Sequence, residues 1–294
     1  SALLARIACG RTWPYEMKIA NVAGLHSQFR RISAIWNSCV DDLSGYSRAA
    51  ASKKETDVAG LKVWLTLPNE LKRSRPSPMG PFWDWMTANA PSEDEFHFVT
   101  AGSLAAWFGI SERKKLTRTQ ANDLVYGAAS MGWTIAPHPD HVDQTIAWDQ
   151  EVAVYRRASL QPPEPQIPGL VRLLYLLMPI AAADGTVEQS EIDAFHRLIS
   201  HEVTRDEDWQ YLEAVLAVLL RDTNTAARAL VPMTRHITPK SRKQVFRLLI
   251  HVAAADGEIA PEEFKVLRKI ARGLDLDPDL AEQIVREDVA FREV

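Results

Sequence analysis

The sequence predicts a mainly α-helical protein with two domains, and three observations carry this prediction. A helix–turn–helix pattern occurs twice in the C-terminal half, a proline-rich stretch precedes that half, and the N-terminal half joins helical periodicity to one pair of strand-like segments. We expect an N-terminal α-rich interaction domain over residues 1–160, a linker over 161–168 and a helical domain over 169–294.

The first part of the chain reads as helical after Pro14. Apolar residues follow one stripe of an expected helix over 29–48, and small polar residues over 49–60 predict a loop. Prolines and basic residues over 70–81 predict an exposed loop, and the aromatic residues of 81–86 begin another helix.

Residues 98–157 predict a winged helix-turn-helix as an alternative to a plain interaction domain. A short helix is expected over 103–108 and a second over 116–133, and the segments 134–139 and 151–157 read as a β-hairpin. In this alternative, phosphate contacts would come from three basic residues, Lys114, Lys115 and Arg118.

The charge of the N-terminal half argues against nucleic acid. Residues 1–168 carry 18 Lys and Arg against 17 Asp and Glu, whereas nucleic-acid-binding domains are usually basic on one face. His138 and His141 lie close together, but they occupy a proline-rich turn without a cysteine partner and do not predict a zinc site.

The proline-rich linker is predicted because four of the eight residues 161–168 are proline, which forces an extended spacer. Seven helices are expected after it, with glycines marking ends and prolines marking starts. Their expected ranges are 169–183, 188–201, 206–221, 223–234, 239–255, 261–273 and 278–289.

The repeat consists of residues 176–199 and residues 248–271, an offset of 72 positions. Both copies contain A-A-A-D-G-x-[VI]-x-x-x-E, and Asp184 in the first matches Asp256 in the second. An apolar helix is expected to end at each Asp-Gly, because glycine adopts the left-handed conformation without a Cβ clash. Acidic residues then begin the next helix, where carboxylates face the positive end of its dipole. The two units are expected to pack with pseudo-twofold symmetry.

The acidic residues of the repeat allow two interpretations. Their spacing equals the second half of an EF-hand loop, but Ile180 and Ala182 stand where the first two oxygen ligands are needed, so the repeat is not an EF-hand. Oxygens from both copies could still hold a cation, and residues 169–294 are acidic, with 16 Lys and Arg against 21 Asp and Glu. In the other interpretation Asp-Gly only ends a helix and the glutamates cap the next one.

The doubled pattern between apolar helices resembles the TerB domain of tellurite-resistance proteins, over roughly residues 169–290. The resemblance implies an all-helical domain of about seven helices that binds a divalent cation (Ca²⁺, Mg²⁺, Mn²⁺ or Zn²⁺). It also implies protein partners in a bacterial stress-response or phage-defence complex, rather than catalysis. Carried over to this sequence, the metal candidates are Asp184, Glu188, Glu191, Asp256, Glu262 and Glu263. Ser190 stands opposite Glu262, so the first copy is less acidic at that point.

The segments 132–141 and 151–156 also resemble the region ahead of TerB in multidomain TerB proteins, without supplying chemistry.

Composition sets the remaining expectations. The two cysteines predict no disulfide framework, and no run of 18 apolar residues predicts a spanning helix. A cytoplasmic location is expected, with membrane association only through partners. No glycine-rich phosphate loop, G-x-S-x-G or H-E-x-x-H occurs, so no enzyme is predicted. The sequence thus predicts a non-enzymatic, divalent-metal-binding scaffold or sensor, with a winged-helix nucleic-acid binder over 98–157 as the alternative.

Overall fold

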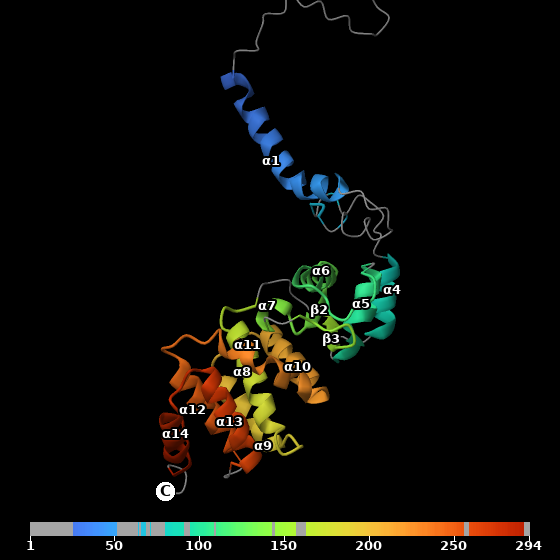
Figure 1. Cartoon of the computed structure of the whole chain (residues 1–294). Coiled ribbons are helices and arrows are strands. Elements are labelled where there is room, and N and C mark those ends of the chain that lie inside the picture. Colours follow the sequence, from blue (N-terminus) through green and yellow to red (C-terminus); the bar gives the residue numbers. More distant parts are fainter. Residues whose placement is uncertain are drawn as a thin grey trace, which may run out of the picture. The chain divides into compact units, whose positions relative to one another are not determined.

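The computed structural model describes residues 26–51, 64, 66–68, 71, 80–90, 95–108, 110–142, 145–156, 163–255 and 259–290. Within these residues it contains twelve helices and one small antiparallel sheet, which confirms the mainly α prediction (Figure 1). The chain divides into two compact units, one of Ser1–Lys54 with Thr66–Pro76 and the other of Glu55–Leu65 with Ser77–Val294.

Helix α1 (His26–Ala51) makes up most of the described part of the first unit. It confirms the helix expected over 29–48. The guanidinium Nε of Arg48 donates a hydrogen bond to the Ser44 carbonyl one turn earlier in the helix. The apolar stripe of α1, which includes Ile32, Ile35 and Trp36, is exposed.

The second unit begins with a helical and sheet region over residues 80–156, called the winged-helix region below. Its elements are α4 (Gly80–Asn89), β1 (His97–Thr100), α5 (Ala101–Trp107), α6 (Arg118–Ala129), β2 (Trp133–Ala136), α7 (Pro139–Val142) and β3 (Glu151–Arg156). The sheet order is β1-β3-β2, and both pairs are antiparallel. This is the order of a winged helix, in which the connection between β2 and β3 is the wing and here contains α7.

The expected hairpin is confirmed by the pairing of β2 with β3, where Ile135 faces Val154. Strand β1 was not expected from the sequence. Helix α6 starts with a capping box, in which the Thr117 side chain accepts from the Gln120 amide and Gln120 caps the Thr117 amide. This cap ends the loop after α5 and fixes where α6 begins.

The core of the winged-helix region lies where α4, α5 and α6 pack on the sheet. Its buried side chains include Phe82, Leu104, Leu124, Trp133 and Val154. Gly102 on α5 lies against the Trp148 ring, and a Cβ added at Gly102 would lie 2.2 Å from Trp148 Nε1. The returning arm of the wing therefore rests directly on α5.

Seven helices follow, as expected. They are α8 (Ile167–Ala181), α9 (Gln189–Ile199), α10 (Asp206–Arg221), α11 (Thr223–Thr234), α12 (Arg242–Ala253), α13 (Pro261–Gly273) and α14 (Pro278–Ala290). Helix α8 is the central one, since it packs against α10, α11, α12 and α13 as well as α7. All residues from 173 to 181 are buried, as expected of a helix that is apolar around its whole circumference.

The predicted linker is partly helical. Helix α8 begins at Ile167, and Pro168 lies in its first turn, where a missing amide hydrogen costs nothing. One core continues across this segment: Ala153 and Tyr155 of β3 pack in the same cluster as the apolar residues of α8. The winged-helix region and helices α8 to α14 accordingly lie in a single compact unit.

Candidate functional site

The turn of the first repeat is built around Asp184. Its Oδ1 accepts hydrogen bonds from the Thr186 amide at 3.0 Å and from the Thr186 hydroxyl at 3.3 Å. Gly185 has a φ of 102°, the left-handed conformation predicted for the glycine at this helix end. Asp184 is exposed, and its hydrogen bonds to Thr186 shape the turn.

Glu191 caps the start of α9 with its side chain. The Glu188 amide donates to Glu191 Oε2 at 3.0 Å, and the Glu191 amide donates to the Glu188 carbonyl at 3.2 Å. Glu191 is only 7% exposed, whereas Glu188 is exposed and also accepts from the Ser190 hydroxyl. The buried glutamate of the motif therefore has a structural role at the helix start.

The second repeat uses its glutamate in the same way. The Ala260 amide donates to Glu263 Oε2 at 2.7 Å, and Glu263 is 8% exposed. Glu262 is exposed and lies 3.5 Å from the Lys265 ammonium. The predicted metal candidate Asp256 lies outside the described residues.

The predicted metal ligands are not brought together in the part of the chain that the structure describes. No group of three or more His, Cys, Asp or Glu among those residues could hold a metal ion. The caps at Glu191 and Glu263 match the interpretation in which the glutamates serve the helix starts. Among the predicted ligands of the first repeat, Asp184 and Glu188 are exposed.

The candidate nucleic-acid residues lie beside the start of α6. Lys114 and Lys115 are exposed, and Lys115 pairs with Ala147 in an isolated β-bridge. Arg118 at the start of α6 forms an ion pair with Asp140 of α7 at 3.0 Å, and Asn122 also donates to Asp140. A recognition helix normally contacts bases through residues near its N-terminus, and here Asp140 binds the side chains at that end of α6.

The electrostatics of Asp140 follow from these neighbours. Burial alone would raise the pKa of Asp140, but hydrogen bonds from Arg118 and Asn122 and the nearby charges of His138 and Arg118 lower it. Asp140 therefore stays charged at neutral pH and holds α7 against α6. Residues 80–156 as a whole carry five Lys and Arg against ten Asp and Glu, a formal charge of −5, the opposite of a nucleic-acid-binding face.

The wing is bound to the helical part through two histidines and a tyrosine. The Tyr211 hydroxyl of α10 lies 2.8 Å from His141 Nδ1 and accepts from the His138 amide at 2.8 Å. The two imidazole rings stack with centroids 5.0 Å apart. Burial, with the charges of His138 and Arg172, lowers the pKa of His141 to about 4, so the ring is neutral at physiological pH.

A second connection joins β3 to the C-terminal end of α10. The Arg221 guanidinium donates to both Glu151 oxygens, at 2.7 Å and 3.1 Å, and lies 4.3 Å from the centre of the Phe98 ring. The hydrogen bond from Arg221 lowers the pKa of Glu151. Helix α10 is thus joined by polar contacts to the wing through Tyr211 and to β3 through Arg221.

No local sequence pattern predicts this interface. The close spacing of His138 and His141 suggests at most a metal pair, and nothing in the sequence links them to Tyr211. The sequence signal for the interface is the closely spaced histidine pair in the turn. The partner of His141, Tyr211, lies 70 residues further along the sequence.

Comparison with known proteins gives one family. The sequence model described as tellurite resistance protein TerB matches residues 171–286, which confirms the resemblance of the C-terminal part. No curated protein and no solved structure matches the chain. Among the described residues, no helix is both long and apolar enough to cross a membrane.

Proposed function

We propose, starting from the TerB domain of residues 171–286, that the chain is a scaffold or sensor in a tellurite-resistance-like stress response. The family match carries this proposal, and TerB is a non-enzymatic domain family. The proposed partners are other proteins of a bacterial stress-response or phage-defence complex.

The central helix supplies a mechanism for such a sensor. The Asp184–Gly185 turn follows the C-terminal end of α8, and the same helix packs against α7 of the wing. Because α8 is buried along most of its length, a partner that displaces the turn would shift the helix as a body and change the contact with the wing. The winged-helix region would then present a changed surface to the next partner.

Deletion of the gene in the bacterium that encodes it, followed by growth on tellurite, tests this function. We expect lower survival on tellurite, restored by the wild-type chain and restored less well by Tyr211→Phe, which loses both hydrogen bonds to the wing but keeps the ring. Challenge with phage forms a second arm. Unchanged survival in both arms would refute the proposed role.

The divalent cation is a separate proposal. It rests on the exposed carboxylates of Asp184 and Glu188 in the first repeat, together with the matching Asp256 of the second, which lies outside the described residues. Calorimetric titration of Ca²⁺, Mg²⁺, Mn²⁺ and Zn²⁺ into the full chain tests it. Saturable heat that disappears on combining Asp184→Asn with Asp256→Asn, and persists in the control Asp193→Asn on α9, would support the site. Titrations without saturable heat would leave the acids as helix caps and turn formers.

Nucleic-acid binding is the second candidate, because the element order is that of a winged helix and Lys114 and Lys115 are exposed. Anisotropy of labelled duplex DNA and single-stranded RNA at low salt tests it, since non-specific binding is electrostatic and typically reaches a Kd of about 10⁻⁴ to 10⁻⁶ M. With a formal charge of −5 over residues 80–156, we expect no saturation. Micromolar binding that weakens with salt and is lost in Lys114→Glu/Lys115→Glu would establish this candidate instead.

A further inference from the structure

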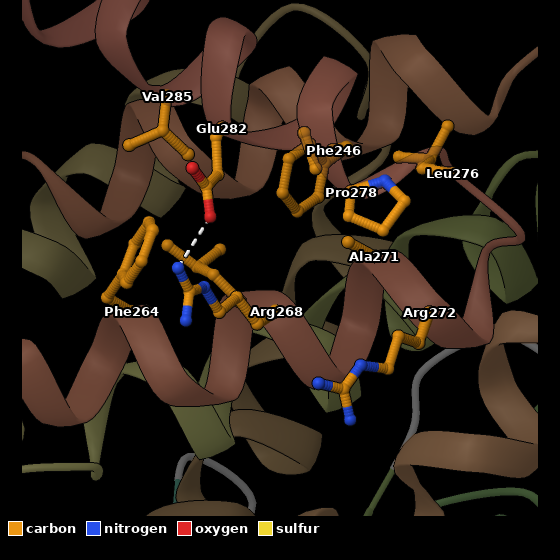
Figure 2. A pocket seen from close by; sticks show the side chains of 11 residues that line it. Phe246, Phe264, Arg268, Ala271, Arg272, Leu276, Pro278, Glu282 and Val285 are labelled. Carbon is orange, nitrogen blue, oxygen red and sulfur yellow. Dashed lines mark hydrogen bonds and ion pairs between the residues drawn. The ribbon is translucent and has the colours of Figure 1, made fainter.

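A cavity of about 230 Å³ opens between α12, α13 and α14, in the C-terminal part of the helical bundle (Figure 2). Its floor is apolar and consists of Phe246 from α12, Leu267 and Ala271 from α13, and Ala281 from α14. All four are buried, at most 5% exposed. The bundle therefore has an apolar hollow near its surface. None of the four floor residues carries a charge that would need solvation.

The rim of the cavity is charged. Arg268 of α13 and Glu282 of α14 form an ion pair, and the Arg268 guanidinium lies 4.7 Å from the centre of the Phe264 ring. Figure 2 shows Arg268 and Glu282 facing each other beside Phe264, with Arg272 farther along the same helix. Arg286 lies 4.0 Å from the same carboxylate.

Two guanidiniums, those of Arg268 and Arg272, and one carboxylate, that of Glu282, thus line the rim, and the guanidinium of Arg286 lies near Glu282 outside the lining. Arg268 and Arg286 remain 54% and 83% exposed, and Arg272 is exposed as well. The rim keeps a positive excess although the region 169–294 carries 16 Lys and Arg against 21 Asp and Glu. An anionic partner is the electrostatic complement of this patch.

The size of the cavity favours a side chain over a whole ligand. Ligand pockets usually measure about 300–1,000 Å³, and this cavity is smaller. An apolar hollow of this size with charges around its mouth matches the way in which a helix inserts an apolar anchor into a groove and uses flanking polar groups for orientation.

We propose that this cavity docks an acidic amphipathic helix of a partner protein, which inserts one apolar side chain and places carboxylates on Arg268 and Arg272. Guanidinium groups suit this task, because their planar fork binds a carboxylate through two parallel hydrogen bonds. Glu282 holds Arg268 in the absence of the partner, so docking exchanges one carboxylate for another. The proposal deepens the scaffold function, on which it rests for the existence of a partner.

The probe is a fluorescein-labelled helical peptide of about 16 residues, long enough to form helix on binding, with Phe and Leu one turn apart and glutamates on the flanks. A matched peptide carries lysines in place of the glutamates. Anisotropy is measured on the purified full chain and on three variants of it. We expect saturable binding of the acidic peptide and much weaker binding of the basic one.

The variants separate docking from general charge effects. Arg268→Gln/Arg272→Gln should weaken binding of the acidic peptide by about tenfold or more, because it removes two charge-assisted hydrogen-bond donors. Glu282→Gln should strengthen it severalfold by removing the competing carboxylate. Lys265→Gln, on the same helix but outside the lining of the cavity, should change little.

Equal binding of the two peptides, unchanged affinity after the double arginine substitution, or weaker binding in Glu282→Gln would each overturn the proposal. Self-association that is lost in the double variant would assign the cavity to a second copy of the chain and also overturn it. Binding of 3-phenylpropanoate as tight as that of the peptide would assign it to a small carboxylate instead. None of these readouts depends on survival on tellurite, so the docking site and the proposed role can fail separately.

Discussion

Lowering the pH should weaken the contact between the wing and the helical bundle, because His141 is held there in its neutral form. His141 is 8% exposed, and its Nδ1 lies 2.8 Å from the Tyr211 hydroxyl. That hydroxyl already accepts from the His138 amide, so its own proton is the natural donor to Nδ1. Protonation of Nδ1 would turn this nitrogen into a donor that faces the Tyr211 hydroxyl hydrogen, and it would place a charge in a buried site.

The magnitude follows from the two pKa values. Burial lowers the pKa of folded His141 from 6.5 to about 4, so the unfolded chain binds more protons between these values and stability falls as the pH drops through them. The loss is negligible above about pH 7.5, about 2 kcal/mol at pH 5 and about 3 kcal/mol below pH 4. Burial also lowers the pKa of His138, which adds to the loss. The lowered pKa of Asp140 acts in the same direction, because the unfolded chain again binds more protons, but its stabilisation is lost only as the pH falls toward and below the usual value of 3.8, outside the range compared here.

Urea unfolding at about pH 7.5 and about pH 5 measures the effect, and the difference between variants removes the contribution of other titrating groups. His141→Asn keeps an acceptor near the position of Nδ1 but cannot take up the proton, so its pH-dependent loss should be smaller by about 2 kcal/mol. His201→Asn, at an exposed position after α9, should retain the full loss. The reasoning is refuted if wild type and His141→Asn lose the same stability between the two pH values.

Three further predictions concern local structure. Gly102→Ala should lower the free energy of unfolding in urea by about 1–3 kcal/mol, because its Cβ would lie 2.2 Å from Trp148 Nε1. Gly169→Ala, on the exposed side of α8, meets nothing within 4 Å and should raise it by about 0.5–1 kcal/mol. Equal effects of the two substitutions would contradict this packing. Glu191→Gln should leave stability nearly unchanged, since glutamine also serves a capping box, and Glu191→Ala should cost about 1 kcal/mol; a large loss in Glu191→Gln would mean that the charge itself matters. Arg221→Gln should speed amide hydrogen exchange in β3 because it removes the paired guanidinium; exchange at the wild-type rate would show that this ion pair does not hold the strand.

The sequence predicts the helical part well because its signals are local. Asp-Gly ends α8 and Pro261 begins α13, and each mark depends only on the conformations that glycine and proline allow. The last two residues of the predicted linker, Ile167 and Pro168, form the start of α8, because proline is compatible with a first helical turn.

Strand β1 and the wing interface cannot be predicted from local sequence signals of this kind. Residues His97–Thr100 become a strand only because β3, more than fifty residues later, pairs with them. The contact between His141 and Tyr211 depends on two segments 70 residues apart, and no local pattern records it. The sequence alone does not decide between capping and cation binding for the repeat glutamates, because both use the same residue type at the same spacing.

Native-state hydrogen exchange at increasing urea concentrations tests most directly whether the winged-helix region and the TerB domain form the single unit that a scaffold or sensor requires. The amides compared are the slowest ones of β3, such as Val154, and the slowest ones of α8, such as Leu174, all of which lie in the buried interior. We predict that both sets merge into one unfolding reaction with the same free energy and the same urea dependence. If β3 exchanges through a separate opening of lower free energy while α8 stays protected, the two regions are independent and the proposed transmission through α8 is contradicted.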